Sequence, residues 1–298
     1  MSLALFLTLF LLGVLGALAC FGGVLILRRT WVARSKRAHD IHLRLIRAEL
    51  MQVIARGDES FIIAHWTKQD RKAAFEVSAQ ILCLLRGRER ERLLDIIDAN
   101  HILREPLGRI NRKAKLRRIA IIRRLVPYDT KTVVGILDRL MVDDPEIEVR
   151  FEAALALAKN NRLDTPWRVI EAICPEGTPL APAHRQLFRS MMPQHSEGFM
   201  TLALYQDRFS ARVLAIDALG SSHDYRIAQR LEPLIDDDDP RIRIEAIKAA
   251  QRIGHSAALL WIIRACANDD TDVRAAALEA CETLAPPAAL EHLQALFA

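Results

Sequence analysis

The side chains best suited to binding chemistry in this sequence are the cations crowded between Arg104 and Arg124. That stretch contains nine Lys or Arg residues and a single acid, Glu105. Apolar residues recurring from Leu116 to Leu125 predict a helix that turns one face to the core, so most of the cations are expected to point outward. The residues expected to bind a partner are Arg109, Arg112, Lys113, Lys115, Arg118, Arg123 and Arg124.

Two interpretations of this basic stretch remain open. One is a solvated helix face close to a membrane, with no ligand of its own. The other is a docking surface for an acidic protein, anionic lipid headgroups or nucleic acid, where a cluster of cations gains from the release of counterions. Nucleic acid is the least favoured of these partners, because the stretch has no aromatic side chain on which a base could stack.

The sequence contains none of the motifs that usually mark an active site. It lacks the glycine-rich phosphate loop, the dinucleotide-binding glycine pattern, the Gly-x-Ser-x-Gly elbow and the His-Glu-x-x-His zinc pattern. His39 and His42 are close in sequence, but they stand among cations without the carboxylate or thiolate partners of a metal site. The run Asp236–Asp239 precedes Pro240 and is expected to cap a helix. We therefore predict no enzyme, no cofactor and no metal site.

The elements that would position a binding surface repeat along the chain. The pattern Arg-x-x-Ala opens several apolar runs, and Arg212, Arg243 and Arg274 are 31 residues apart. Arg150 precedes Arg212 by 62 residues, which is twice that interval. A fixed period of this length is typical of a helical repeat array, in which each unit buries its apolar face by stacking on its neighbours. Runs of helical period alternate with breaks rich in Gly, Pro, Asp and Asn, so we predict an all-α fold.

Three segments resemble the second helix of a HEAT repeat. They begin at Asp144, Asp239 and Asp270, and each continues into Val-Arg-x-x-Ala or Ile-Arg-x-x-Ala. The resemblance covers residues 60–298 and implies an α-solenoid of about seven helical hairpins. It also implies that turn acids and helix arginines form a structural ladder between successive repeats. By position, the ladder residues are Asp144, Arg150, Asp207, Arg212, Asp239, Arg243, Asp270 and Arg274.

The resemblance is weakest between residues 175 and 200. Arg185 is followed by Phe188 where the other units have Ala, and four prolines interrupt the run. This segment is therefore either an irregular repeat or an insertion on one face of the array.

Residues 1–29 are predicted to anchor the chain in a membrane. No charged residue occurs from Leu3 to Leu27, and a helix of that length rises roughly 37 Å, against a bilayer core of ~30 Å. A cleaved signal peptide is disfavoured because nothing before Leu3 is basic, and a lipoprotein signal at Cys20 because the apolar run continues beyond it. The residues expected at the membrane interface are Arg28, Arg29, Trp31, Arg34, Lys36 and Arg37.

These cations also predict orientation, because positive charge stays on the cytoplasmic side. The N-terminus is expected to face outward across the inner (cytoplasmic) membrane, with the remainder of the chain in the cytoplasm. Residues 30–59 are expected to form a basic amphipathic helix that lies along the anionic leaflet or caps the array, and residues 60–298 the solenoid. The apolar face of that helix would comprise Ile41, Leu45, Leu50, Val53 and Ile54.

Charge is divided unevenly along the chain. Residues 28–124 carry 24 Lys/Arg against 11 Asp/Glu, whereas residues 125–298 carry 18 against 26. We expect a membrane-anchored adaptor that binds a membrane-associated protein and, by analogy alone, belongs to an enzyme complex for envelope or polysaccharide synthesis. Two alternatives stay open: a small-molecule-handling protein similar to the bilin lyases among HEAT-like families, and a nucleic-acid-binding HEAT-like protein. The sequence assigns no oligomeric state.

Overall fold

The computed structural model describes residues 3–56, 63, 65–108, 110, 114–177 and 179–285, apart from many side chains near the start of the first helix. Every regular element among these residues is helical, as expected. The chain divides into two compact units, Met1–Arg109 and Ile110–Ala298, called the N-terminal and C-terminal units below.

The N-terminal unit is built on one long helix. Its helices are α1 (Leu3–Arg56), α2 (Lys68–Leu84), α3 (Gly87–Ala99) and α4 (Arg104–Gly108). α1 runs without interruption through the expected anchor and most of the expected juxtamembrane helix. The expected boundary with the solenoid, at residue 60, lies outside the described residues.

The apolar face of α1 differs from the expected one. Leu50 and Val53 are buried and α1 packs on α2 and α3, whereas Ile41 and Leu45 are 58% and 64% exposed. The prediction was therefore wrong for the first two positions of that face. The buried stripe instead follows Ile46, Leu50 and Val53, whose i, i+4, i+7 spacing keeps them on one side of the helix.

The C-terminal unit is a succession of short helices. Its elements are α5 (Lys115–Leu125), α6 (Lys131–Asp143), α7 (Ile147–Lys159), α8 (Pro166–Ile173), α9 (Pro182–Tyr205), α10 (Phe209–Leu219), α11 (Tyr225–Arg230), η2 (Glu232–Asp236), α12 (Pro240–Ile253), η3 (Ser256–Ala258), α13 (Leu259–Ala265) and α14 (Thr271–Leu284).

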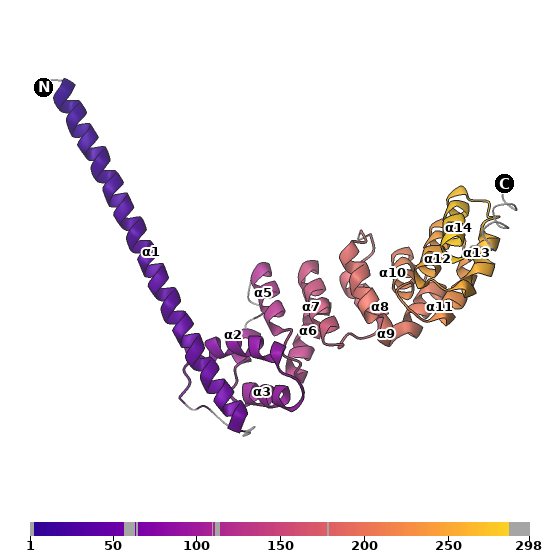
Figure 1. The fold of residues 1–298 in the computed structure, drawn as a ribbon, viewed down its shortest axis with the longest axis horizontal. Coiled ribbons are helices and arrows are strands. Elements are labelled where there is room, and N and C mark those ends of the chain that lie inside the picture. Colours follow the sequence, from indigo (N-terminus) through magenta and orange to yellow (C-terminus); the bar gives the residue numbers. More distant parts are fainter. Residues whose placement is uncertain are drawn as a thin grey trace. The chain divides into compact units, whose positions relative to one another are not determined.

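These helices form two parallel rows, which Figure 1 shows as successive pairs. In one row α5 packs on α7, α7 on α9, α9 on α10, α10 on α12 and α12 on α14. The other row contains α6, α8, α11 with η2, and α13. From α7 onward, the helices of this row are the second helices of successive pairs, and stacking of the pairs buries the core. We call the first set the second-helix row.

The irregular segment at residues 175–200 is part of this array. α9 is kinked at His195, where the backbone leaves helical geometry two residues after Pro193. A proline inside a helix lacks an N–H and clashes with the preceding turn, which explains the kink. The first half of α9 packs on α7 through an edge-to-face contact between His184 and Phe151, with ring centroids 5.1 Å apart. The second half lies beside α11, as the Glu197–Arg230 ion pair indicates, so one helix serves two successive pairs.

The kinked helix also explains the interval of 62 residues between Arg150 and Arg212. Arg185 is the fourth residue of α9, just as those two arginines are the fourth residues of α7 and α10. Phe188 takes the place of the usual alanine because it packs edge-to-face on Phe199 across the kink, at 6.2 Å between centroids. The equivalent alanines elsewhere are fully buried where neighbouring helices come close, at Ala153, Ala215, Ala246 and Ala277.

Ion pairs and hydrogen bonds join each pair of helices to the next along the surface. Arg162 binds Asp129 at 2.9 Å, and Arg264 binds Glu232 at 2.8 Å. The bonded residues are 33 and 32 positions apart, close to the 31-residue period. Such exposed pairs contribute little to stability, but their spacing shows that equivalent surface positions of adjacent repeats face one another.

Candidate functional site

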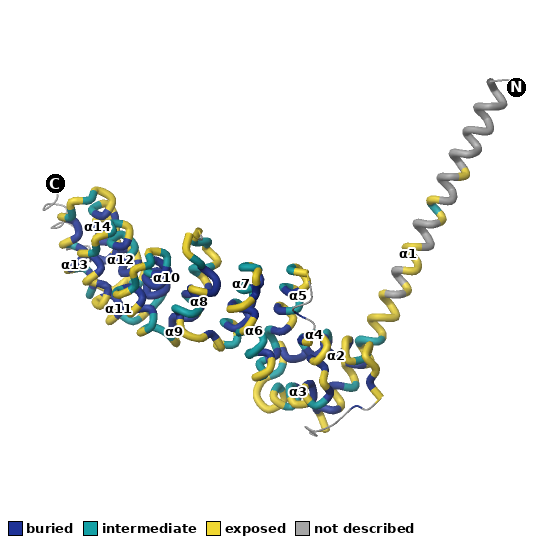
Figure 2. Tube along the Cα trace, turned by 180° about the vertical axis from the view of Figure 1, so that it is seen from behind, coloured by how far each residue is buried: buried dark blue, intermediate teal, exposed yellow. Residues whose placement is uncertain are grey.

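The site is organised around α10, which is buried on nearly all sides. All but three of its eleven residues are buried, and α10 is mostly dark blue in Figure 2. Its neighbours in the second-helix row, α9 and α12, cover it from both sides. Ser210, Val213, Asp217 and Gly220 recur at helical spacing and so share one face of α10. This face is the floor of the site.

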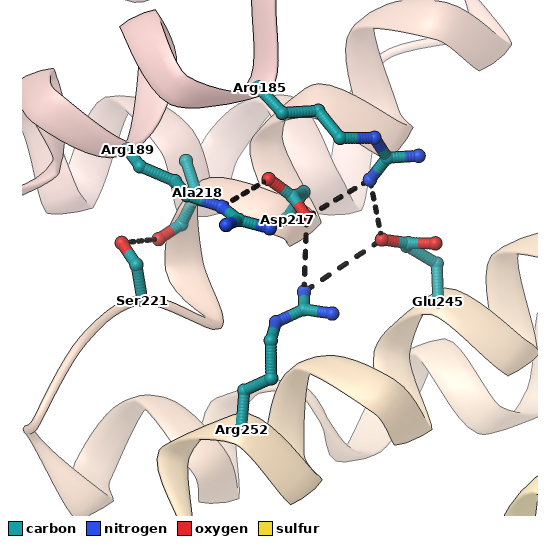
Figure 3. Close-up of polar contacts among 7 residues, drawn as sticks. All are labelled: Arg185, Arg189, Asp217, Ala218, Ser221, Glu245 and Arg252. Atoms are coloured by element: carbon teal, nitrogen blue, oxygen red, sulfur yellow. Dashed lines mark hydrogen bonds and ion pairs between the residues drawn. The ribbon is translucent and has the colours of Figure 1, made fainter. Parts of the chain in front are cut away.

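At the closed end of this floor lies a buried acid, Asp217, whose side chain is only 1% exposed. Arg189 donates two hydrogen bonds to its carboxylate, from Nε at 2.8 Å and from Nη2 at 2.7 Å. Nη1 of Arg185 lies 3.0 Å from the same carboxylate, and Nη2 of Arg252 lies 3.4 Å from it. Figure 3 shows these side chains converging from α9 and α12. Burying a carboxylate is unfavourable unless it is paired and hydrogen-bonded in this way.

A second acid, Glu245, completes the cluster. Its Oε1 accepts a hydrogen bond from Arg185 at 2.9 Å and lies 3.8 Å from Arg252. We call Arg185, Arg189, Asp217, Glu245 and Arg252 together the arginine cluster. It contains three guanidinium groups and two carboxylates, so its formal charge is +1.

The electrostatic balance of the cluster is visible in two pKa shifts. Burial by itself would raise the pKa of Asp217, but the hydrogen bond from Arg189 and the charges of Arg252 and Arg185 outweigh it and lower that pKa. Burial lowers the pKa of Arg252. The charges of Asp217 and Glu245 raise this pKa and those of Arg189 and Arg185 lower it, but the net shift is downward. The carboxylate is thus well stabilised, while the positive charge at Arg252 is incompletely balanced.

At the open end of the α10 floor lies a cavity of about 590 Å³. The cavity and the cluster share Arg185 and Glu245. On the cavity side, the guanidinium of Arg241 stacks over the Phe209 ring at 4.0 Å. The remaining lining residues are Glu176, Gly177, Leu180, Asp207, Arg208, Ser210 and Val213. We call the cavity and the adjoining cluster the α9–α12 groove.

The groove closes because α10 and α12 touch at Gly220. A Cβ atom at this position would lie 2.8 Å from the Cα atom of Ala249 and 2.7 Å from Nη2 of Arg252. The backbone of Gly220 is ordinary right-handed helix, with φ −64°. Glycine is therefore required here because it lets α10 and α12 approach closely, and not because of its conformational freedom.

In its described part, the basic stretch singled out in the sequence makes contacts within the C-terminal unit. Lys115 pairs with Glu148 at 2.8 Å, and Arg123 donates two hydrogen bonds of 2.9 Å to Glu152. Both acids belong to α7, so these cations join α5 to the next helix of the second-helix row. Arg124 is exposed, and Arg109, Arg112 and Lys113 lie outside the described residues. Contact of these residues with a partner stays a prediction.

Two further details of that stretch differ from expectation. Arg118 is buried with its side chain 10% exposed, and its Nη2 donates to Asp144 at 2.9 Å. Leu116, expected in the core, is 76% exposed. Both follow from the helix phase, because Arg118, Ile122 and Leu125 form the inward stripe of α5. Arg118 is therefore a structural residue within this unit.

A ladder of arginines and turn acids exists, but its pairs differ from those implied by the HEAT resemblance. Arg118 pairs with Asp144, and Arg212 forms a very short ion pair with Asp237. Each of these acids stands three residues before the helix that follows it. For Arg150, the described part of the chain shows no ion pair.

The remaining ladder residues act within their own turns. Arg243 donates to the carbonyl oxygen of Asp237 and Arg274 to that of Asn268, both at 2.7 Å. Asp239 and Asp270 cap α12 and α14 by accepting hydrogen bonds from backbone N–H groups. An N-cap oxygen is directed toward its own helix, which explains why these acids do not reach the preceding repeat. Asp207 has no ion pair among the described residues and lines the groove instead.

The residues expected at a membrane interface lie in the middle of α1. Those with described side chains are all exposed: Arg28, Arg29, Trp31, Arg34, Lys36 and Arg37. The expected anchor at residues 1–29 falls mostly on side chains outside the described residues. In the part of the chain that the structure describes, none of the helices combines the length and the apolar character that a membrane crossing requires.

The groove was missed in the sequence because its residues come from separate helices. Arg189 and Asp217 are 28 positions apart, and Arg185 and Glu245 are 60 apart. The available signal was Asp217 itself, an acid in the middle of an otherwise apolar run. Buried acids are rare unless paired, so such a residue predicts basic partners nearby in space.

Comparison with known proteins agrees with the repeat architecture. Residues 197–280 and 228–298 match the family model described as HEAT repeats. A crystal structure of an engineered protein, determined by the Northeast Structural Genomics Consortium, is 16% identical, with 80% of this chain and 96% of that chain covered and a TM-score of 0.26. No curated protein matches this sequence. Among the described residues the chain is thus an all-α helical repeat protein, and its C-terminal part, residues 197–298, matches HEAT repeats.

Proposed function

We propose that this protein is a membrane-anchored scaffold, not an enzyme, and that it holds a protein partner in the α9–α12 groove. The observation that carries the proposal is the groove itself, in which a cavity of about 590 Å³ adjoins a partly exposed cluster of charged side chains. Stacked helical repeats usually work as extended binding surfaces. Polar groups converging on a cavity that also has apolar lining residues are typical of a recognition site.

The membrane anchor is supported by the sequence of α1. The segment from Leu3 to Leu27 carries no charged residue, and the cations from Arg28 to Arg37 follow it directly. We propose that this segment crosses the inner membrane with the N-terminus outside and the repeats in the cytoplasm. A partner held by such a scaffold would itself be associated with the membrane, and a subunit of an enzyme complex for envelope or polysaccharide synthesis fits that description.

The anchor is tested by carbonate extraction of membranes and by proteolysis of intact cells. The protein should stay in the membrane pellet, and the C-terminal unit should resist protease until the cells are opened. Release by carbonate would exclude an integral anchor. Digestion of the C-terminal unit in intact cells would exclude the proposed orientation.

The partner is tested by affinity purification of the full-length protein in mild detergent, followed by mass spectrometry. Ser210→Trp places a large side chain in the groove and should abolish recovery of the partner. Ser256→Trp makes the same change at an exposed serine of η3, outside the groove, and should leave recovery unchanged. If no protein is enriched with the wild-type chain, or if both variants recover it equally, the proposed binding site is wrong.

A further inference from the structure

The arginine cluster holds more hydrogen-bond donors than its two acids can use. Arg185 uses only Nη1 for both Asp217 and Glu245, although a guanidinium carries five N–H donors. Arg252 approaches the same acids at 3.4 and 3.8 Å, longer than a good hydrogen bond. The side chains of Arg185, Arg189 and Arg252 keep 31%, 36% and 33% of their surface exposed. Donors and surplus positive charge are therefore accessible to an anion from outside.

An apolar surface lies directly beside these donors. Leu180, Phe209 and Val213 line the cavity, which the cluster borders through Arg185 and Glu245. A ligand that reaches the guanidinium groups therefore places its neighbouring atoms against apolar side chains. Carboxylates match the fork of an arginine better than other single anionic groups in proteins.

Arg208 and Arg241 line the cavity, but two acids also lie there and disfavour ligands with many negative charges. Glu176 and Asp207 line the cavity and are exposed, and neither has an ion pair within the described residues. Residues 125–298 carry 26 acids against 18 basic residues. The several phosphates of a nucleic acid would be repelled by Glu176 and Asp207. A peptide with one carboxylate has a much smaller repulsive Coulomb energy with these two acids.

We propose that the α9–α12 groove recognises a peptide segment in which an Asp or Glu adjoins an aliphatic or aromatic residue. The carboxylate pairs with Arg252 and the free donors of Arg185, and the apolar side chain enters the cavity beside Val213. This inference rests on the proposed function, because it names the chemistry of the partner segment. It places the acidic recognition element in the groove and not on the basic stretch around α5.

The test is selection of peptides from a phage-displayed random library on the full-length protein in detergent micelles. Enriched sequences should pair an acid with a neighbouring apolar residue, and their synthetic peptides are then measured by fluorescence anisotropy. Arg252→Gln should weaken binding about tenfold, the effect of losing one charge-assisted hydrogen bond. Arg264→Gln removes an equally charged side chain from an exposed ion pair on α13 and should leave affinity unchanged.

A second variant separates binding from stability. Asp207→Asn removes an acid that lines the cavity and should strengthen binding of the acidic peptides, and a gain in affinity cannot come from misfolding. Enrichment of basic sequences, enrichment without common chemistry, or equal affinity for Arg252→Gln and Arg264→Gln would overturn the inference. If a partner still co-purifies with Arg252→Gln, the inference fails while the scaffold proposal stands. If no partner co-purifies with the wild-type chain, the scaffold proposal fails first.

Discussion

Replacing Gly220 with alanine tests whether the groove is closed by direct contact between α10 and α12. The added methyl group would meet the Cα atom of Ala249 at 2.8 Å and two guanidinium atoms of Arg252 at 2.7 and 2.9 Å. The arginine can move aside because its end is flexible. The backbone of Ala249 can retreat only if α12 shifts, and α12 also supports α14.

The expected loss of folding stability follows from the general effect of adding atoms to a closely packed interior. Inserting a methyl group into a filled contact destabilises a protein by about 1 to 3 kcal/mol. For a unit of this size each kcal/mol lowers the melting midpoint by about 2 to 4 °C, so Gly220→Ala should lower it by ~6 °C. The loss of the Arg252 position should also weaken ion pairing to Asp217, which adds to the effect.

Gly135 provides a matched control in the same unit. It lies inside α6, and a Cβ atom there would meet nothing within 4 Å. Gly135→Ala should therefore stabilise the protein by roughly 0.5 to 1 kcal/mol, because alanine is the better helix former. Both variants are measured by circular dichroism at 222 nm during thermal and urea unfolding. A melting midpoint of Gly220→Ala at or above that of the wild-type chain would refute the proposed contact.

Three further predictions concern ion pairs. Asp217→Asn should destabilise the C-terminal unit by about 2 to 4 kcal/mol in urea unfolding, because three arginines lose their buried partner. Since the pKa of Asp217 is lowered from 3.8, its contribution is present above that value and is lost as pH falls through the folded-state pKa. The wild-type chain should therefore lose more stability than Asp217→Asn on acidification from pH 5 to pH 3, and parallel losses would contradict the assignment. Arg118→Met should cost about 3 kcal/mol by leaving buried Asp144 without its ion pair, and a Met/Leu double variant that replaces both residues should recover part of that loss. Neutralisation of Lys115 and Arg123 to Gln should leave the melting midpoint nearly unchanged because Lys115 is partly and Arg123 largely exposed, and a large decrease would contradict their surface role.

Much of the array could be predicted from the sequence because its signals are local and periodic. The 31-residue spacing of Arg212, Arg243 and Arg274 correctly predicts equivalent positions in successive helices. Asp239 belongs to the acidic run that was expected to cap a helix, and it caps α12. A helix cap depends only on residues within one helical turn, and the repeat depends on exact recurrence along the chain. A single sequence is therefore sufficient to recognise both signals.

The parts that could not be predicted depend on contacts between distant helices. Apolar periodicity alone does not distinguish Leu45 from Ile46 as the buried residue of α1, because both fit an amphipathic pattern. The exposure of Leu116 depends on where α7 packs against α5. The arginine cluster forms only when Asp217 lies in contact with arginines from two other helices, and no local sequence pattern predicts that contact.

The sharing of α9 between two helix pairs affects how the array comes apart. Arrays of repeats usually unfold from their ends, because each turn between helices is a place where one unit can detach from the next. Within α9 the chain has no such turn, since its two halves follow one another directly across the kink at His195. Loss of either half withdraws support from both neighbouring pairs. This segment should therefore melt as one cooperative block, and hydrogen exchange should report equal opening free energies for α8 and α10.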